Sequence, residues 1–272
     1  MFRMIRLGAL ALLASGVLTP AARGGPQDAS GRFEEVRRFK AAEARQGVAV
    51  DPGFVYAITN RAIGKYEKRT GTLVKRWEGP PDGPIIHLDS GVVIDGRLYC
   101  AHSNYDALPM ESSIEIFDTA TLEHVGSQSL GIMDGSATWV DRKDGFWWVA
   151  FANYAGDGGV PGRGPEWTVL LKFDEQWRRV AGYTYPREIV AKFGEMSNSG
   201  GTWGADGFLY ITGHDNAEIY KMALPTAGTV LKVVATFPVR AEGQGIAWDR
   251  SDPGMMYTIL RSSTEVVASR LR

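Results

Sequence analysis

A block of four short strand-like runs recurs five times along this chain, and this repeat limits the fold more than any other feature of the sequence. In the first block the runs cover residues 47–50, 54–59, 62–68 and 72–77. Turn-forming residues such as Asp51-Pro52-Gly53 separate these runs. The first runs of the five blocks begin at or next to Gly47, Gly91, Gly135, Gly200 and Gly245.

Four short strands at a period of about 45 residues are typical of a β-propeller blade. The fifth block ends at Arg272 with three runs, and the run 33–40 upstream of the first block can supply its fourth strand. This arrangement closes the ring and removes an exposed sheet edge. We therefore predict an all-β fold: a five-bladed β-propeller with four-stranded antiparallel blades, closed by the N-terminal strand in the last blade.

The residues before the repeat predict export. Residues 1–6 are basic, residues 7–18 are apolar, and small residues follow up to Ala22. This order is typical of a secretory signal peptide, and the apolar run is too short to span a bilayer. We predict a signal peptide at 1–22, a flexible lead-in at 23–31 and a single propeller domain at 32–272. The protein is thus expected to be secreted or periplasmic, without a membrane anchor because no cysteine lies near the cleavage site.

Charge and cysteine content narrow the possible partners. Lys and Arg number 30 and Asp and Glu number 31, so there is no charge surplus that would favour nucleic acid. Cys100 is the only cysteine, which excludes an internal disulfide and predicts a small buried residue in mid-strand. Trp139, Trp203 and Trp248 recur at one register and are expected in the core between blades rather than as a sugar platform. We expect a monomer.

The loops of an antiparallel propeller fall on two faces, and here the two faces differ in chemistry. One face carries turns of Asp and Gly, such as Asp95-Gly96 and Asp206-Gly207, where these residues serve the turn itself. The other face carries the approach to each first strand and the exit from each second strand, and it gathers His, Asp, Glu, Arg and amide side chains. A ring of such groups around one mouth of the channel is the expected location of a small-molecule site.

The candidate site residues all come from this polar face. We assign a catalytic role to His102, His214, Asp89 and Glu242. We assign substrate binding to Gln46, Arg61, His87, Asn104, Asn153, Asp215, Gln244 and Arg261. The segment 156–165 is rich in Gly and Pro and can form either a flap over the mouth or a disordered surface loop.

Several reactions fit these residue types. Imidazole titrates near neutrality and suits general acid/base catalysis, paired carboxylates suit glycoside cleavage, and Arg61 or Arg261 can clamp a substrate carboxylate. No sequence signature of a zinc site is present, so we expect no metal and no cofactor. The leading hypothesis is an enzyme of cyclotransferase, lyase or hydrolase type that acts on a peptide end or a sugar. The alternative is a non-catalytic propeller that binds a carbohydrate or a protein.

The first block also resembles a known family. Gln46-Gly47, Phe54-Val55-Tyr56 and Thr70-Gly71 are similar to plant-type glutaminyl cyclotransferases, which are secreted five-bladed propellers that cyclise N-terminal glutamine. The resemblance implies the same fold and activity for this chain. The family has a catalytic Glu just before the Gly that opens its second blade, and here that place reads Asp89-Ser90-Gly91, with His87 nearby.

A second likeness covers the polar face. The runs 102–104, 199–204 and 212–215 resemble a set of uncharacterised secreted propeller proteins. This resemblance implies a propeller fold and names no reaction.

Overall fold

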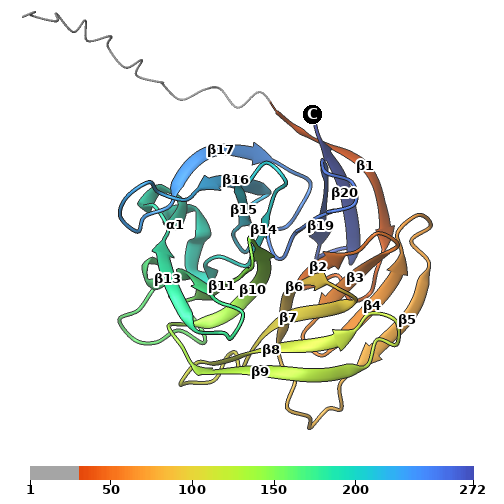
Figure 1. Ribbon diagram of the computed structural model, residues 1–272, viewed down its shortest axis with the longest axis horizontal. Coiled ribbons are helices and arrows are strands. Elements are labelled where there is room, and N and C mark those ends of the chain that lie inside the picture. The colour runs from red at the N-terminus through yellow and green to blue at the C-terminus, as the bar shows by residue number, and fades with distance from the viewer. Residues whose placement is uncertain (1–30) are drawn as a thin grey trace, which may run out of the picture.

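The computed structural model describes residues 31–272 as five four-stranded sheets arranged around a central axis. Figure 1 looks along the shortest axis of the molecule and shows the sheets following one another around the ring. The predicted five-bladed β-propeller is therefore confirmed. The predicted signal peptide lies outside the described residues, as does the lead-in except for its last residue.

The first two blades follow the repeat closely. Blade 1 consists of β2 (Gly47–Val50), β3 (Phe54–Thr59), β4 (Ala62–Glu67) and β5 (Leu73–Glu78). Blade 2 consists of β6 (Leu88–Ile94), β7 (Arg97–Ser103), β8 (Glu111–Asp118) and β9 (His124–Ile132). In both blades neighbouring strands pair antiparallel.

The next two blades are separated by a short helical segment. Blade 3 consists of β10 (Ser136–Lys143), β11 (Phe146–Ala152), β12 (Val169–Phe173) and β13 (Arg179–Thr184). Blade 4 consists of β14 (Gly200–Trp203), β15 (Leu209–Thr212), β16 (Glu218–Ala223) and β17 (Lys232–Pro238). Between them lie α1 (Arg187–Phe193) and η2 (Gly194–Met196), and η1 (Pro165–Trp167) precedes β12. No helix among residues 31–272 has the length and apolar character needed to cross a membrane.

The fifth blade joins the two ends of the described chain. It consists of β18 (Ala247–Trp248), β19 (Met255–Leu260), β20 (Glu265–Leu271) and the N-terminal β1 (Phe33–Lys40). β1 pairs antiparallel with β20, from Phe33 opposite Leu271 to Lys40 opposite Glu265. Figure 1 shows the two strands side by side. The predicted ring closure is confirmed, and the edge that β20 would otherwise expose is covered.

The inner strands pack tightly around the axis because small residues stand where they meet. A Cβ atom on Gly245 would lie 2.5 Å from the Cβ of Ser90 and 2.7 Å from the Cα of Gly47. Real Cβ atoms do not approach other heavy atoms so closely, so glycine is needed at this contact. The Gly245 amide also donates a hydrogen bond of 2.9 Å to the Gln46 carbonyl and links blade 5 to blade 1.

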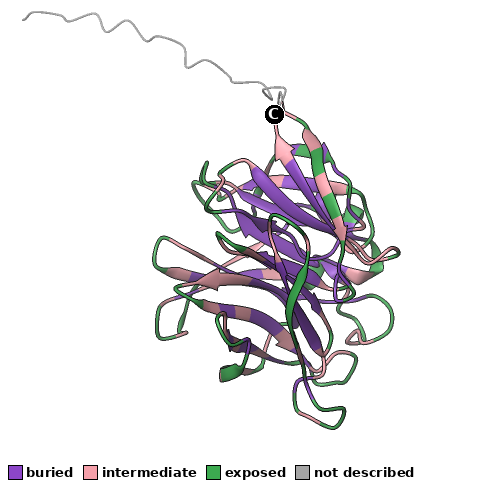
Figure 2. Ribbon diagram, turned by 90° about the vertical axis from the view of Figure 1, so that its right-hand side faces the viewer, coloured by how far each residue is buried: buried purple, intermediate pink, exposed green. Residues whose placement is uncertain are grey.

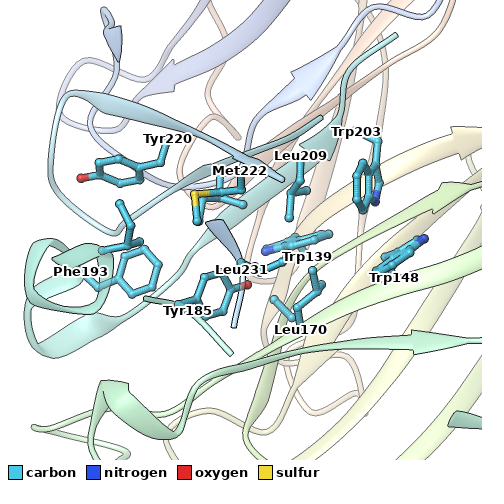
Figure 3. Close-up of a cluster of buried hydrophobic side chains, with 13 residues drawn as sticks. Trp139, Trp148, Leu170, Tyr185, Phe193, Trp203, Leu209, Tyr220, Met222 and Leu231 are labelled. Carbon is cyan, nitrogen blue, oxygen red and sulfur yellow. The ribbon is translucent and has the colours of Figure 1, made fainter. Parts of the chain in front are cut away.

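Large apolar side chains fill the spaces between blades. Figure 2 shows the inner strands buried and the outer edges and loops exposed. In the cluster of Figure 3, Trp148 and Trp203 lie with ring centroids 4.9 Å apart, and Phe193 of α1 contacts Tyr185 edge to face. Trp139 belongs to the same cluster and is fully buried. The tryptophans expected in the core are there, and so is Cys100, which is a buried free thiol.

Asn198 ties this cluster to blade 4 through a set of buried hydrogen bonds. Its side-chain oxygen accepts from Trp139 Nε1 at 2.7 Å and from the Tyr185 hydroxyl at 2.9 Å. Its amide nitrogen donates to the carbonyls of Gly200 and Thr212. Because a buried polar group is costly when it lacks a partner, one side chain that satisfies four groups contributes strongly to stability.

Candidate functional site

The polar face contains a cavity of about 510 Å³ at the mouth of the channel. Residues from all five blades line it, as expected where the loops of a propeller converge. Blades 1 and 2 contribute Gln46, Asn60, Ile86, His87, Asp89, Tyr105 and Asp106. Blades 3 to 5, with the segment between blades 3 and 4, contribute Thr138, Tyr154, Met196, Ser199, His214, Gln244 and Arg261. The predicted residues Gln46, His87, Asp89, His214, Gln244 and Arg261 thus meet at one cavity.

Irregular pairing turns two inner-strand residues towards this cavity. In β6 the register shifts between Leu88 and Gly91, so Asp89 lies inside a bulge. In β10 the register shifts between Ala137 and Trp139, which leaves Thr138 in an equivalent irregularity. A β-bulge re-aims a side chain that regular alternation would direct elsewhere. This local geometry is why Asp89 and Thr138 line the mouth.

Asp89 is a buried carboxylate whose hydrogen-bonding partner within residues 31–272 is a histidine. The residue is 4 % exposed, and its nearest ionisable partner is His87, with Nε2 3.5 Å from Asp89 Oδ2. Burial raises the pKa of Asp89, and a hydrogen bond from His87 and the positive charge of Arg261 oppose this rise. A carboxyl group whose pKa is raised by burial holds a proton more readily than an exposed one, which suits a group that accepts a proton and returns it.

The other buried carboxylates of the described chain are satisfied at shorter range. Glu43 accepts from Tyr66 at 2.6 Å and Arg76 at 2.7 Å. Glu115 accepts from Ser113, Ser127 and His124, all within 2.9 Å. Asp141 accepts from the Trp203 amide at 2.8 Å, and Asp249 pairs with Lys68 at 2.7 Å. Asp89 differs from all four because its carboxylate lines the cavity and has no protein donor at such short range.

Aromatic rings form the wall beside Asp89. The His87 ring lies 5.1 Å from the ring of Tyr105, which in turn lies edge to face 5.1 Å from the ring of Tyr154. Burial raises the pKa of both tyrosine hydroxyls, so these groups are neutral hydrogen-bond donors at neutral pH. The wall can pack against the apolar face of a ligand while the Tyr154 hydroxyl donates a hydrogen bond to it.

A second group of charged residues lies on the blade 4 and blade 5 side of the cavity. His214 Nδ1 lies 2.7 Å from Asp215 Oδ1, and His214 Nε2 lies 3.1 Å from Arg261 Nη1. Burial and the neighbouring guanidinium lower the pKa of His214, so the imidazole is neutral at neutral pH. Asp215 does not line the cavity; its side chain is 75 % exposed and lies behind His214.

His102 is held within blade 2 and does not line the cavity. Its Nε2 accepts the amide hydrogen of Ile86 at 3.1 Å, so Nδ1 carries the proton and donates to Ser113 Oγ at 2.9 Å. Burial lowers the pKa of His102, in agreement with this neutral tautomer. Because Ile86 and the following His87 line the cavity, His102 holds the segment that carries the site.

The remaining predicted residues serve loops around the mouth. Glu242 accepts hydrogen bonds from the amide and hydroxyl of Ser262, which lower the pKa of the Glu242 carboxyl. Arg61 donates to the carbonyls of Pro80 and Pro81.

The two asparagines predicted to bind substrate form hydrogen bonds with backbone groups of loops instead. Asn104 bridges the loop between β7 and β8 through the Pro109 carbonyl and the Glu111 amide. Asn153 is buried and donates to the carbonyls of Asp134 and Trp167.

Sequence reasoning missed the aromatic wall. Tyr105 and Tyr154 directly follow Asn104 and Asn153, which were predicted to bind substrate. An aromatic residue in the loop after a second strand was therefore the sequence signal for this wall. The segment 156–165 is absent from the cavity lining, and Tyr105 Oη donates to the Asp157 carbonyl at 3.3 Å. The segment therefore contacts the wall at Tyr105 and contributes no residue to the cavity lining.

Several carboxylates of the opposite face make short contacts with cations or backbone amides of the same face. Asp141 contacts Arg250, Asp206 pairs with Lys221 at 2.9 Å, and Asp51 accepts the amide of Gly53 at 2.7 Å. These contacts fix turns and join blades, in agreement with the structural role expected for this face. Within residues 31–272, no group of three or more His, Cys, Asp and Glu side chains is arranged to hold a metal ion.

Comparison with known proteins supports the fold and names no family. No protein-family model matches the chain, and no curated protein matches its sequence. Among solved structures, a streptogramin B lyase is similar with a TM-score of 0.50 at 12% identity, over 89% of this chain and 98% of that one. A luciferin-regenerating enzyme has a TM-score of 0.49 at 11% identity, over 86% and 94% of the chains. Hydrazine synthase of Kuenenia stuttgartiensis has a TM-score of 0.48 at 12% identity, over 82% of each chain.

Proposed function

We propose that this chain is an acid/base enzyme that acts on a small polar molecule bound at the mouth of the channel. The observation that carries the proposal is Asp89, a buried carboxylate that opens into a polar cavity with its nearest ionisable group, His87, at 3.5 Å. Leaving a buried carboxylate without short hydrogen bonds costs stability, and perturbed ionisable groups of this kind cluster at active sites.

In the proposed reaction Asp89 takes a proton from an amine or hydroxyl group of the substrate and returns it to the leaving group. His87 Nε2 lies 3.5 Å from Asp89 Oδ2 and stabilises the ionised carboxylate by donating a hydrogen bond to it. The rings of Tyr105 and Tyr154 pack against the substrate, and the Tyr154 hydroxyl donates a hydrogen bond to it. His102 and Glu242 act through the loops that they hold, because neither lines the cavity.

Cyclotransferase chemistry on a peptide end is the specific form of this proposal. Resemblance to plant-type glutaminyl cyclotransferases supports it, because Asp89 stands next to the place of that family's catalytic Glu. The amine nitrogen would attack the side-chain amide carbon, the bond to the amide nitrogen would break, and Asp89 would carry the proton from the amine to the departing ammonia. We further propose that the protein works outside the cytoplasm, on the basis of its apolar leader.

The test is turnover of glutamine-terminal peptides, glycosides and lactones by the wild-type protein and by Asp89→Asn. Loss of a general base lowers kcat by about 10²- to 10⁴-fold. Asp106→Asn is the matched control, because Asp106 lines the same cavity but is exposed, and its turnover should stay within about threefold of wild type. Full turnover in a folded Asp89→Asn variant would reject the proposal. Ligand binding at the cavity without turnover of any substrate would favour a non-catalytic carbohydrate-binding or protein-binding propeller.

A further inference from the structure

Among the residues from 31 to 272 that line the cavity, Arg261 is the one cationic side chain that is charged at every pH in the working range. It follows β19, and its side chain is 35 % exposed. Its nearest carboxylate is the exposed Asp215, at 4.0 Å, which is too long for a close ion pair. By contrast, Arg142 and Arg179 contact carboxylates at 2.8 and 2.9 Å. Within the described part of the chain the Arg261 guanidinium makes one hydrogen bond, to His214, so most of its donors are available to a ligand.

His214 fixes the direction of this guanidinium. A guanidinium can only donate hydrogen bonds, so His214 Nε2 must accept from Arg261 Nη1. The proton of the neutral imidazole then lies on Nδ1, which donates to Asp215 Oδ1 at 2.7 Å. This chain of contacts holds Arg261 at the cavity without neutralising it, as a site for an anionic group requires.

The two ends of the cavity carry opposite charge. Asp89 and His87 lie on the blade 2 side, and His214 and Arg261 lie on the blade 4 and blade 5 side, with Gln46 and Gln244 also in the lining. A ligand that satisfies both ends carries an anion at one end and a proton-donating amine or hydroxyl group at the other. A planar guanidinium with free donors matches the two oxygens of a carboxylate.

We propose that the site selects small substrates with a free carboxylate, which Arg261 binds while His214 orients it. The proposal rests on the function proposed above, because the proton-donating end of the substrate is assigned to Asp89. Two classes of compound offer this chemistry: short peptides or amino acids with a free C-terminus, and sugar acids.

The test compares matched ligands that differ in the carboxylate alone. Isothermal titration would use free-acid and amidated dipeptides, glucuronate and glucose, and inorganic phosphate. The carboxylate member of at least one pair should bind, and its neutral partner should not. Arg261→Gln should raise the Kd of that carboxylate by about 10- to 100-fold, the loss expected for a charged hydrogen-bonded pair, and Arg261→Lys should be intermediate. A response of the dipeptide pair identifies the ligand class as peptides or amino acids, and a response of the glucuronate and glucose pair identifies it as sugar acids.

Arg61→Gln is the control for the loss of one positive charge. Arg61 follows β3 as Arg261 follows β19, but it donates to loop carbonyls and is absent from the lining. Its substitution should leave the Kd of the carboxylate within about twofold, since additional charges on an exposed surface contribute little. Equal effects of Arg61→Gln and Arg261→Gln, binding of phosphate alone, or no discrimination by any pair would overturn the proposal.

The variants also separate this proposal from the proposed reaction. Asp89→Asn should abolish turnover and retain carboxylate binding, because it leaves Arg261 intact. Carboxylate binding that depends on Arg261, together with turnover that survives Asp89→Asn, would reject the reaction and keep the specificity. Turnover of neutral substrates that needs Asp89 and is unaffected by Arg261→Gln would keep the reaction and reject the specificity.

Discussion

Replacing Asp89 with Asn should stabilise the protein at neutral pH although it removes the proposed catalytic group. The wild-type carboxylate is 4 % exposed and its partner His87 lies at 3.5 Å, so keeping its negative charge in this site costs roughly 1–3 kcal/mol. Asn has nearly the same shape and carries no charge, so most of the cost of the charge disappears. For a domain of this size, each kcal/mol shifts Tm by about 2–4 °C. The expected rise in Tm at pH 7 is therefore about 2–10 °C.

The pKa shift of Asp89 determines over which pH range Asp89→Asn should be more stable than the wild type. Burial raises the pKa of Asp89 in the folded protein above its unfolded value of about 4. Between these two values the folded state binds more protons than the unfolded chain, so the stability of the wild type falls as pH rises through this window. Asn does not titrate. The advantage of Asp89→Asn should therefore be near zero at about pH 4 and should reach its full size above the folded-state pKa.

The assay is calorimetry or urea unfolding of both proteins from pH 4 to pH 8, with Asp106→Asn as a second reference. Asp106 lines the same cavity but is exposed, so its substitution should change the free energy of unfolding by less than about 0.5 kcal/mol at every pH. An Asp89→Asn variant that is less stable than wild type at pH 7 would refute the reasoning, because Asp89 would then be a satisfied structural group. If the difference in unfolding free energy between Asp89→Asn and the wild type did not change with pH, the argument that ionisation of Asp89 causes it would be refuted.

Two further predictions concern the packing that supports the site. Asn198→Ala removes the partner of four buried polar groups and should lower the free energy of unfolding by about 3–5 kcal/mol in urea titrations; a loss below about 1 kcal/mol would contradict the role assigned to this side chain. Gly245→Ala introduces a Cβ 2.5 Å from that of Ser90 and should cost about 1–3 kcal/mol or more. Gly126→Ala, whose Cβ would meet nothing nearer than 3.8 Å, should be nearly neutral in the same titration.

The fold was predictable because its signal repeats. Five copies of one strand and turn pattern give five independent indications of the same blade, and strands such as Phe54–Thr59 lie where the pattern predicts them. The helix Arg187–Phe193 was not predicted, since it occurs once, in the long step between blades 3 and 4. A single short segment has no repeat to support it, and its role in covering the cluster around Trp139 depends on tertiary packing.

The site was only partly predictable because a side chain's direction depends on where a strand ends. His102 is expected in an exit loop, but β7 continues to Ser103, so His102 pairs within the sheet and its ring lies against Ser113. A shift of one residue in a strand reverses the face on which a side chain lies. The bulge at Asp89 has the opposite effect, since it brings an inner-strand residue to the mouth. Neither the continuation of β7 nor the bulge has a signature in the local sequence.

The contrast between the two faces is the strongest reason to locate function at this mouth. On the opposite face, carboxylates such as Asp141 and Asp249 are buried with short bonds to cations or amides, so they stabilise the ring. At the polar mouth, Asp89 remains without a short bond, and Arg261 is held by a neutral histidine instead of a close carboxylate. The described chain pairs its other buried carboxylates at short range and leaves Asp89 and the partly exposed Arg261 available to a ligand. A ligand that binds both groups stabilises the folded state, so a true substrate should also raise Tm.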